Sequence, residues 1–266
     1  MATITASMVN ELRSKTGLGM MECKRMLAET EGNIDKAIEA FRKKGVKTSI
    51  MERVATEGRV SCQTRGNRAA AIEINCNTDF TAKSDTVAAL LELGLNKLLD
   101  GAKDLASDAE FAAALTAAAQ QTGENVQLGR TAALEGNVGS YLYSTAGKGK
   151  IAVLMSFGTP ASDELSRNLG MHIVAGRPVA LSRDQVPADL VTKEREIAVE
   201  QARATGKPQQ IAEKIAEGKL NAFFAERVLL DQDFINTDVF SGKVSDFLKK
   251  QGNTLTAYAR LEVGQH

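Results

Sequence analysis

Apolar and polar residues follow two different periodicities along this chain. In the first 45 residues, apolar side chains recur every three or four positions within three short segments that glycines separate, a spacing typical of helices. Thr5 or Ser7 is a candidate cap for the first helix, and Asn33 for the third. Gly17 and Gly32 are expected to end the first two helices. The pattern therefore predicts a small three-helix bundle.

Beyond about residue 55, β-branched and alternating segments follow one another in the same order twice. Each copy reads as a strand, a turn, a second strand, a loop and a helix. The strands and helix are predicted at 59–64, 69–75 and 85–99 in the first copy, and at 138–144, 151–157 and 163–175 in the second. Hairpins of this kind predict antiparallel sheets covered by helices on one face.

Further elements are predicted between and after the two copies. An Ala-rich helix is expected at 108–121 with Ser107 as its cap, and additional strands at 126–134 and 254–263. Gly206-Lys207-Pro208 interrupts two helical segments whose apolar stripe is too narrow for a buried helix. This predicts a protruding antiparallel helical hairpin.

The expected fold class is therefore α+β, and the length of 266 residues allows two or three compact domains. The core is a duplicated hairpin-plus-helix unit with antiparallel sheets. The predicted units are the bundle at 1–45, a polar linker at 46–56, a first core subdomain at 57–135, a second core subdomain at 136–187 and 229–266, and the helical hairpin at 188–228.

Composition and charge narrow the possible partners. Hydrophobic residues make up 43% of the chain and charged residues 25%, the balance of a folded protein. Lys and Arg together number 33, and Asp and Glu also number 33, so no overall positive field would gather nucleic acid. Nucleic acid is therefore not an expected direct partner.

Cysteine usage and apolar runs indicate the compartment. Cys23, Cys62 and Cys76 lie far apart and lack the Cys-x-x-Cys spacing of zinc sites and redox motifs. No basic and apolar secretory signal opens the chain, and no segment approaches the roughly 20 apolar residues of a membrane helix. We therefore expect a cytoplasmic protein with reduced thiols and no membrane partner.

Residues suited to covalent catalysis are scarce. His172 lies in a predicted helix, where a packed and hydrogen-bonded ring is expected rather than a catalytic base. Gly17-Leu18-Gly19 and Gly147-Lys148-Gly149 lack the strand-turn-helix setting of a nucleotide site and are predicted to be turns. Carboxylates are scattered, with no isolated pair. We expect no enzyme activity, catalytic residue, cofactor or metal site, and no small-molecule substrate of the protein's own.

Two segments combine turns with large apolar side chains. In the polar loop at 75–83, Phe80 stands beside Asp79, and its ring is expected either to fold back over the core or to project as an anchor for a partner. Gly19-Met20-Met21 places two soft thioethers just after a turn, which suits an adaptable protein contact. We expect one of these methionines to be buried and the other to face a partner.

These segments and several others resemble, in order and over nearly the whole chain, the elongation factor Ts family of translation factors. The similar segments are Glu11-Leu12-Arg13, Thr16-Gly17, Gly19-Met20-Met21-Glu22-Cys23-Lys24, Gly32-Asn33-Ile34-Asp35-Lys36-Ala37-Ile38, Asn75-Cys76-Asn77-Thr78-Asp79-Phe80, Gly123-Glu124-Asn125, Ala132-Ala133-Leu134-Glu135-Gly136, Met171-His172-Ile173-Val174-Ala175, Gly206-Lys207-Pro208, Ile211-Ala212-Glu213-Lys214 and Arg260-Leu261-Glu262-Val263-Gly264.

The resemblance implies a guanine nucleotide exchange factor for the GTPase elongation factor Tu. The loop with Thr78, Asp79, Phe80 and Thr81 would enter the G domain near the switch II helix and displace the magnesium ion that bridges the nucleotide phosphates. GDP would then leave and GTP could bind. Phe80 would be the wedge, and Asp79 its hydrogen-bonded or electrostatic companion.

The resemblance also implies further contacts. The N-terminal helices would form a ubiquitin-associated-type bundle that docks on the G domain through Met20 and Met21, and Thr122 and Gly123 would contribute elsewhere. The second copy and the helical hairpin would hold other parts of elongation factor Tu. The chain departs from the family at Thr81, where an aliphatic residue is common, at Thr122, where isoleucine is frequent, and in the linker, which lacks a Lys-Ala-rich run.

Two other functions remain open from the residues alone. A ubiquitin-associated-type adaptor for another helical protein would use the first 45 residues, but it would leave the Phe80 loop and the duplicated units without a task. A hydrolase would have to use the scattered carboxylates. A pull-down with this protein separates the three functions. An exchange factor captures elongation factor Tu, an adaptor captures another protein, and a hydrolase captures neither.

Overall fold

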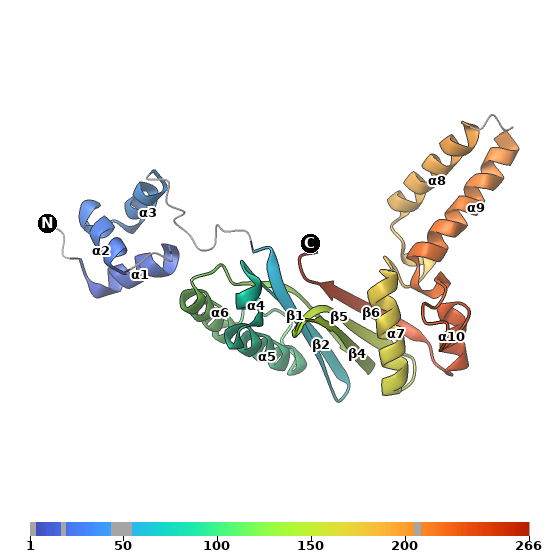
Figure 1. Cartoon of the computed structure of the whole chain (residues 1–266), viewed down its shortest axis with the longest axis horizontal. Helices are drawn as coiled ribbons and strands as arrows, with labels where there is room; N and C mark the ends of the chain where they lie inside the picture. Colours follow the sequence, from blue (N-terminus) through green and yellow to red (C-terminus); the bar gives the residue numbers. More distant parts are fainter. Residues whose placement is uncertain (1–3, 17–19, 44–54, 205–208, 266) are drawn as a thin grey trace.

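We describe a computed structural model of the chain, which defines residues 4–16, 20–43, 55–204 and 209–265. Figure 1 shows three helices at the N-terminal end, a central body of strands and helices, and a pair of helices that extends from the other end of this body. The mixed α+β architecture predicted from the sequence is confirmed.

The N-terminal helices are α1 (Ala6–Thr16), α2 (Met20–Glu29) and α3 (Ile34–Lys43). The Thr5 hydroxyl accepts from Met8 N at 3.3 Å and the Asn33 side chain accepts from Lys36 N at 2.9 Å, so Thr5 rather than Ser7 caps α1. Gly32 follows α2 with a φ of 81°, as a helix-ending glycine should, whereas Gly17 lies outside the described residues.

Two three-stranded antiparallel sheets form the centre of the protein. The first has the order β1-β2-β3, and the second β4-β5-β6. Their strands are β1 (Glu57–Arg65), β2 (Arg68–Cys76), β3 (Gln127–Glu135), β4 (Asn137–Thr145), β5 (Lys148–Phe157) and β6 (Leu255–Glu262). Each predicted hairpin therefore recruits a third strand from later in the chain, and this strand pairs with the second strand of the hairpin.

Helices cover one face of each sheet, as predicted, and the other face is also covered, because the two sheets pack against each other. Helices cover the outer faces, while the inner faces pack against each other through a cluster that includes Val60, Ala71, Ala152, Leu154 and Leu261. The small alanine side chains allow the two sheets to approach closely. Burial on both sides also explains why β2 and β5 read as nearly continuous apolar runs.

The helices of the first repeat are α4 (Asp79–Lys83), α5 (Asp85–Leu99) and α6 (Ala109–Thr122), and those of the second are α7 (Asp163–Gly176) and α10 (Val244–Lys250). Two of them, α4 and α10, are too short for the sequence pattern to predict. Asp108, not Ser107, caps α6, because its carboxylate accepts from Phe111 N at 2.9 Å. The Ser107 hydroxyl donates instead to Asp104 at 2.5 Å.

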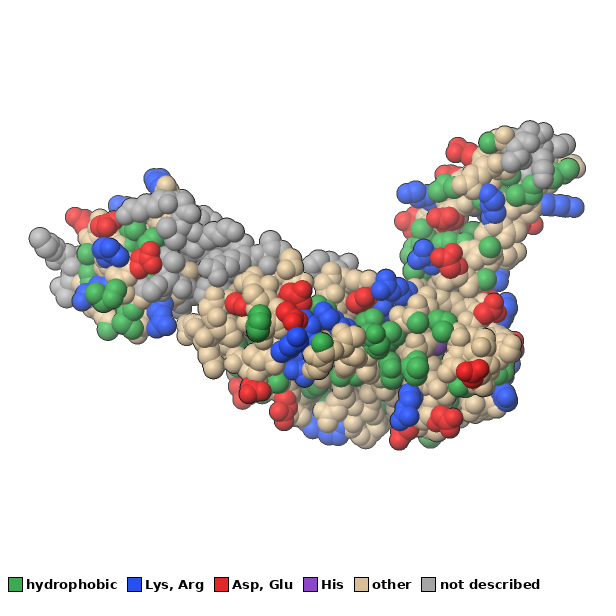
Figure 2. All heavy atoms as spheres, viewed as in Figure 1, with side chains coloured by type: hydrophobic (Ala, Val, Ile, Leu, Met, Phe, Trp, Pro, Cys, Tyr) green, Lys and Arg blue, Asp and Glu red, His purple; other side chains and the backbone are tan. Residues whose placement is uncertain are grey.

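The predicted helical hairpin is present as α8 (Ala188–Arg203) and α9 (Gln209–Arg227), flanked by the 3-10 turns η2 (Arg183–Gln185) and η3 (Leu229–Asp231). Its buried seam is narrow and made largely of small residues, Ala198, Ala202, Ala216 and Leu220. Basic and acidic side chains are interspersed over its visible surface (Figure 2). Among the described helices, none combines the length and apolar composition needed to cross a membrane.

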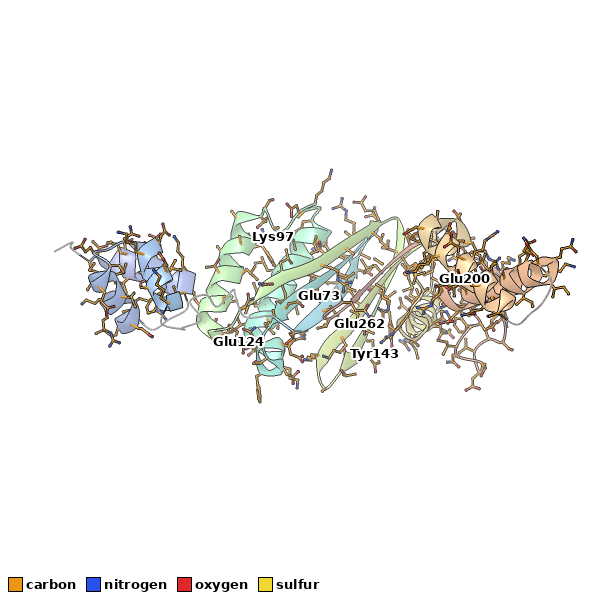
Figure 3. All side chains as sticks on the ribbon, turned by 90° about the horizontal axis from the view of Figure 1, so that it is seen from above. Glu73, Lys97, Glu124, Tyr143, Glu200 and Glu262 are labelled. Atoms are coloured by element: carbon orange, nitrogen blue, oxygen red, sulfur yellow. The ribbon has the colours of Figure 1, made fainter. Side chains whose placement is uncertain are left out.

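A cluster of hydrogen bonds joins the first sheet to the C-terminal segment. The buried Glu73 on β2 accepts from Arg130 Nε and from Gly264 N, each at 3.0 Å. Arg130 also donates to the carbonyl of Glu262 at 2.5 Å. Viewed from above, Glu73 and Glu262 lie in the middle of the body, where the two sheets meet (Figure 3). The two repeats therefore share one framework, on which the loop after β2 is built.

Candidate functional site

The loop that follows β2 is organised around α4, a single helical turn held by a cap at each end. Thr78 is extended, with φ −128° and ψ 155°, and its hydroxyl accepts from Thr81 N at 3.3 Å. At the other end, Ser84 N donates to the carbonyl of Thr81 at 3.0 Å, and the Ser84 hydroxyl accepts from Val87 N at 3.3 Å to cap α5. The two caps define where α4 begins and where it ends.

The ring of Phe80 points away from the protein. Its exposed fraction is 89%, the largest among the exposed large hydrophobic side chains of the described residues. Thr81 and Ala82 are buried, because successive residues of a helix point in directions about 100° apart. The ring therefore does not cover the core. Thr81, predicted as a partner contact, instead faces inward beneath the loop.

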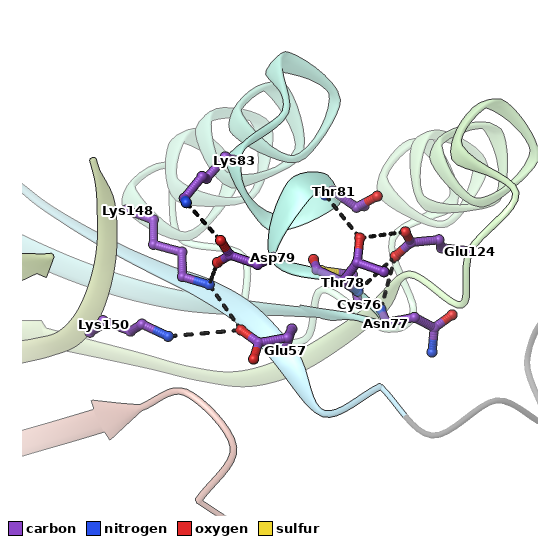
Figure 4. Close-up of polar contacts among 10 residues, drawn as sticks. All are labelled: Glu57, Cys76, Asn77, Thr78, Asp79, Thr81, Lys83, Glu124, Lys148 and Lys150. Carbon is purple, nitrogen blue, oxygen red and sulfur yellow. Dashed lines mark hydrogen bonds and ion pairs between the residues drawn. The ribbon is translucent and has the colours of Figure 1, made fainter. Parts of the chain in front are cut away.

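Glu124 clamps this loop from the far end of α6, as Figure 4 shows. Its carboxylate accepts from Asn77 N and Thr78 N, each at 3.0 Å, and from the Thr78 hydroxyl at 2.6 Å. In return, Asn125 N donates to the Asn77 side chain at 2.8 Å. Burial alone would raise the pKa of Glu124, but the hydrogen bonds from Thr78, Thr81 and the two backbone amides together lower it.

The end of α6 directs Glu124 toward the loop. The Thr122 hydroxyl donates to the carbonyl of Ala118 at 2.8 Å, and Gly123 adopts the left-handed conformation with φ 68°. Only glycine adopts this conformation without strain, so the chain turns sharply here and enters β3. The structure thus brings Thr122 and Gly123 close to Thr78, with Glu124 as the link.

Asp79 belongs to a chain of alternating charges (Figure 4). One of its carboxylate oxygens pairs with Lys83 at 2.6 Å and the other pairs with Lys148, which also binds Glu57 at 2.9 Å. Hydrogen bonds from Lys148 and then Lys83 lower the pKa of Asp79 to about 2. Burial opposes the charge of Lys148, yet the bonds to Asp79 and Glu57 leave its pKa raised. The loop is therefore ionised and internally paired at neutral pH.

Comparison with known proteins identifies the family. A family model described as Elongation factor TS matches residues 77–265, from the Asn77 side of this loop almost to the C-terminus. The chain belongs to the elongation factor Ts family. Elongation factor Ts of Psychrobacter sp. (strain PRwf-1) is 38% identical over 277 aligned residues, which cover 100% of this chain and 92% of the relative.

Two further relatives show the same extent of similarity. Elongation factor Ts of Syntrophotalea carbinolica (strain DSM 2380 / NBRC 103641 / GraBd1) is 38% identical and covers 98% of this chain and 93% of its own. That of Psychrobacter cryohalolentis (strain ATCC BAA-1226 / DSM 17306 / VKM B-2378 / K5) is 37% identical and covers 98% and 91%. The predicted resemblance is confirmed, and membership of the elongation factor Ts family gives the chain a role in translation elongation.

The two methionines lie apart from α4 in sequence and in the fold, at the start of α2. Met20 is 52% exposed and Met21 is 72% exposed, so the expectation that one of them is buried is wrong. The buried face of α2 is formed by Cys23, Met26 and Leu27, and both methionines lie in the turn before this face. The N-terminal bundle of this elongation factor Ts family member thus exposes both thioether side chains.

Sequence reasoning missed the residues that hold the loop, namely Glu57, Glu124 and Lys148. Glu124 had no local signal, because the N–H groups that it accepts from belong to Asn77 and Thr78, in a loop far from it in the sequence. Lys148 had none, because its segment was predicted to be a turn. The turn is only Ala146 and Gly147, and Lys148 is the first residue of β5.

His172, the histidine considered as a catalytic base, has a structural role. His172 is buried, stacks on Phe234 with ring centroids 5.3 Å apart, accepts from Ile235 N at 3.2 Å through Nδ1, and bonds Gln232 at 3.0 Å through Nε2. The ring is therefore packed and hydrogen-bonded, as predicted, and burial lowers the pKa of His172, which favours the neutral form. Among the described side chains, no cluster of three or more His, Cys, Asp or Glu is arranged to hold a metal ion.

Proposed function

We propose that this chain is a guanine nucleotide exchange factor that binds elongation factor Tu with GDP, promotes GDP release so that GTP can bind, and catalyses no covalent reaction. The observation that supports this proposal most directly is the exposed ring of Phe80 on a short helix that is fixed at both ends. A large apolar ring held in water by its own scaffold is suited to fill a pocket on another protein.

The wedge acts on the magnesium ion and the phosphate-binding loops of the partner. Magnesium and oriented backbone amides supply much of the affinity of a GTPase for its nucleotide. Phe80 enters the G domain beside the switch II helix, displaces that helix and disturbs the magnesium ion. The factor needs no general base for this step, because the free energy comes from binding the distorted state more tightly than the undistorted one.

The energetics are within reach of a few side chains. A thousandfold weakening of GDP binding corresponds to about 4 kcal/mol of coupling between the two ligands. One well-placed anchor contributes roughly 2 to 4 kcal/mol. The coupling is reciprocal, so GDP weakens the binding of the factor to elongation factor Tu by the same ratio.

Other surfaces hold the partner while the wedge acts. Met20 and Met21 offer two adjacent, adaptable side chains on the N-terminal bundle. Thr122 and Gly123 lie beside the loop and extend its contact surface. The second repeat and the helical hairpin engage regions of elongation factor Tu away from its nucleotide site.

A release assay tests the proposal. Elongation factor Tu loaded with a fluorescent GDP is mixed with excess GDP and with wild-type factor, Phe80→Leu or Phe80→Ala. We expect wild type to accelerate release and Phe80→Ala to lose that acceleration by about 30-fold or more, the equivalent of a 2 kcal/mol anchor. Phe80→Leu, which keeps an apolar side chain, should fall between them.

The same variants provide the folding control. Because Phe80 is so exposed, its truncation should change the free energy of unfolding by less than about 0.5 kcal/mol. No acceleration by wild type would exclude the exchange function. Acceleration that is equal in wild type and Phe80→Ala would retain the function but exclude the wedge.

A further inference from the structure

Lys148 belongs to the second repeat, but its charged end lies in the loop of the first. It opens β5, opposite Thr145 on β4, and is 3% exposed. Its ammonium group pairs with Asp79 on α4 and, at 2.9 Å, with Glu57 at the start of β1. A buried lysine that joins two carboxylates from another repeat is a specific arrangement, because an unpaired ammonium group in this position would be strongly destabilising.

The backbone explains how the side chain reaches so far. The two-residue turn at Ala146 and Gly147 folds β4 tightly onto β5. The next glycine, Gly149, lies against β1 so closely that a Cβ atom there would be 2.1 Å from the carbonyl oxygen of Val60. No larger residue fits without moving the hairpin. The tip of the second hairpin is thus held on the first sheet, and Lys148 is directed at α4.

We propose that Lys148 is a positioning residue for nucleotide exchange, which acts through Asp79 to hold α4 and thereby fixes the direction of Phe80. Asp79 then acts inside this protein, where it joins α4 to Lys148. The inference rests on the proposed function of Phe80. It follows from the geometry of Asp79, whose two carboxylate oxygens are already engaged by Lys148 and Lys83.

The physical benefit is preorganisation. The helix α4 has only five residues, and any freedom of direction left to it would weaken the complex by the entropy of ordering it on binding. Lys83 lies on α4 itself and cannot tie α4 to the rest of the protein. Lys148 provides that connection from a strand of the second sheet. Its removal would also leave Asp79 and Glu57 without the cation that lies between them.

The first test measures the loop without any partner. The natural chain contains no tryptophan, so Phe80→Trp places a single tryptophan at the tip of the loop. We expect the fluorescence anisotropy of Trp at this position to fall when Lys148→Met is added, because α4 gains freedom. Lys97→Met is the matched control, since Lys97 also joins two carboxylates in the first repeat, Asp108 at 3.0 Å and Glu110 at 2.8 Å, but does not touch α4. It should leave the anisotropy unchanged.

The second test is a double-mutant cycle in the GDP release assay with Phe80 intact. We expect Lys148→Met and Asp79→Asn each to slow release about tenfold, and the double variant to be no slower than either one, because both break the same contact. Effects that multiply to about a hundredfold would overturn the inference, since Asp79 would then act on the partner independently of Lys148. An unchanged anisotropy in the Lys148→Met background would overturn it as well.

The outcomes separate this inference from the proposed function. If wild type does not accelerate GDP release, the proposed function fails, while the anisotropy still reports whether Lys148 holds α4. If wild type accelerates release and Lys148→Met does so equally, only the positioning role fails. Should Lys148→Met not fold, Asp79→Asn replaces it in the anisotropy test, because the Asp79 side chain is half-exposed and its change to an amide releases α4 from the same lysine.

Discussion

The same position in the two repeats carries two different loops. After β2, residues 77–83 contain α4 with its outward ring, whereas after β5 the shorter segment 158–161 passes directly to the next helix. Both loops end at a serine that caps a long helix. Ser84 accepts from Val87 N at 3.3 Å, and Ser162 accepts from Leu165 N at 3.1 Å. The shared scaffold thus extends to the helix cap, and the difference lies between strand and cap.

The clamps on the two loops also correspond in position but differ in charge. In the second repeat, Asn253 just before β6 bonds Thr159 twice, at 3.3 Å to its N–H and at 3.1 Å to its carbonyl. In the first repeat, Glu124 just before β3 accepts three hydrogen bonds from the loop. A neutral amide suffices for a plain connection. The loop that presents Phe80 has an ionised clamp on one side and Lys148 on the other, which indicates that its direction matters.

Making the first loop like the second should abolish nucleotide exchange. Replacing residues 78–83 by the Thr-Pro-Ala sequence of 159–161 removes α4 but keeps Asn77 and the Ser84 cap. We expect acceleration of GDP release to disappear entirely, because no anchor remains. Circular dichroism and the thermal midpoint report whether the fold persists. Retained acceleration in a folded variant would show that the loop is not the exchange element.

The Glu124 clamp and the Asn253 clamp can be removed one at a time. Glu124→Ala leaves three donors without their acceptor, which should lower the free energy of unfolding by about 1 to 3 kcal/mol, and Asn253→Ala should do the same in the second repeat. Only Glu124→Ala should also slow GDP release, by about tenfold, because only its loop carries Phe80. Denaturant titrations measure the first effect, and the release assay on fully folded protein measures the second. An equal slowing by Asn253→Ala would mean that both loops serve exchange.

Local pattern predicted most of the fold but not the contacts that hold the site. The hairpins, the bounds of α5 and the helical hairpin followed from periodicity and from glycine and proline positions, because these are properties of neighbouring residues. The helix α4 did not, since five residues are too few to show a period. The pairing of Lys148 with Asp79 had no local signal, because it joins residues from different repeats. Phe80 could be singled out from the sequence, but whether its ring folds over the core or projects from the protein could not, and the structure shows that it projects.

Acid should affect the two repeats in different pH ranges. Burial lowers the pKa of His172 from its ordinary value of 6.5. As pH falls below about 6.5, the ring therefore takes up a proton in the unfolded protein before it does so in the folded one. The second repeat loses stability in this range. Glu124 and Asp79 have lowered pKa values, to about 2 for Asp79, so their contribution is full above their unfolded pKa values near 4 and is lost only as pH falls further.

The measurement is the free energy of unfolding against pH. The buried His172 changes it by at most about 1.4 kcal/mol per pH unit. His172→Gln should flatten the slope just below pH 6.5 and leave the slope below pH 4 intact, and Glu124→Gln should do the reverse. A Glu124→Gln variant that keeps the full wild-type slope below pH 4 would contradict the assignment of acid sensitivity to the clamp.

The turns of the two hairpins should affect stability slightly and exchange not at all. In the first hairpin, Gly66 takes the left-handed position with φ 60°, whereas in the second Ala146 is forced into it with φ 49°. A side chain there costs about 1 kcal/mol, so Ala146→Gly should raise the free energy of unfolding by a few tenths to 1 kcal/mol. GDP release should not change, because the ion pair of Lys148 with Asp79 depends on the packing of Gly149 against β1 and not on the turn itself. Slower release in this more stable variant would mean that the rigidity of the turn, and not the packing of Gly149 against β1, sets the direction of the loop.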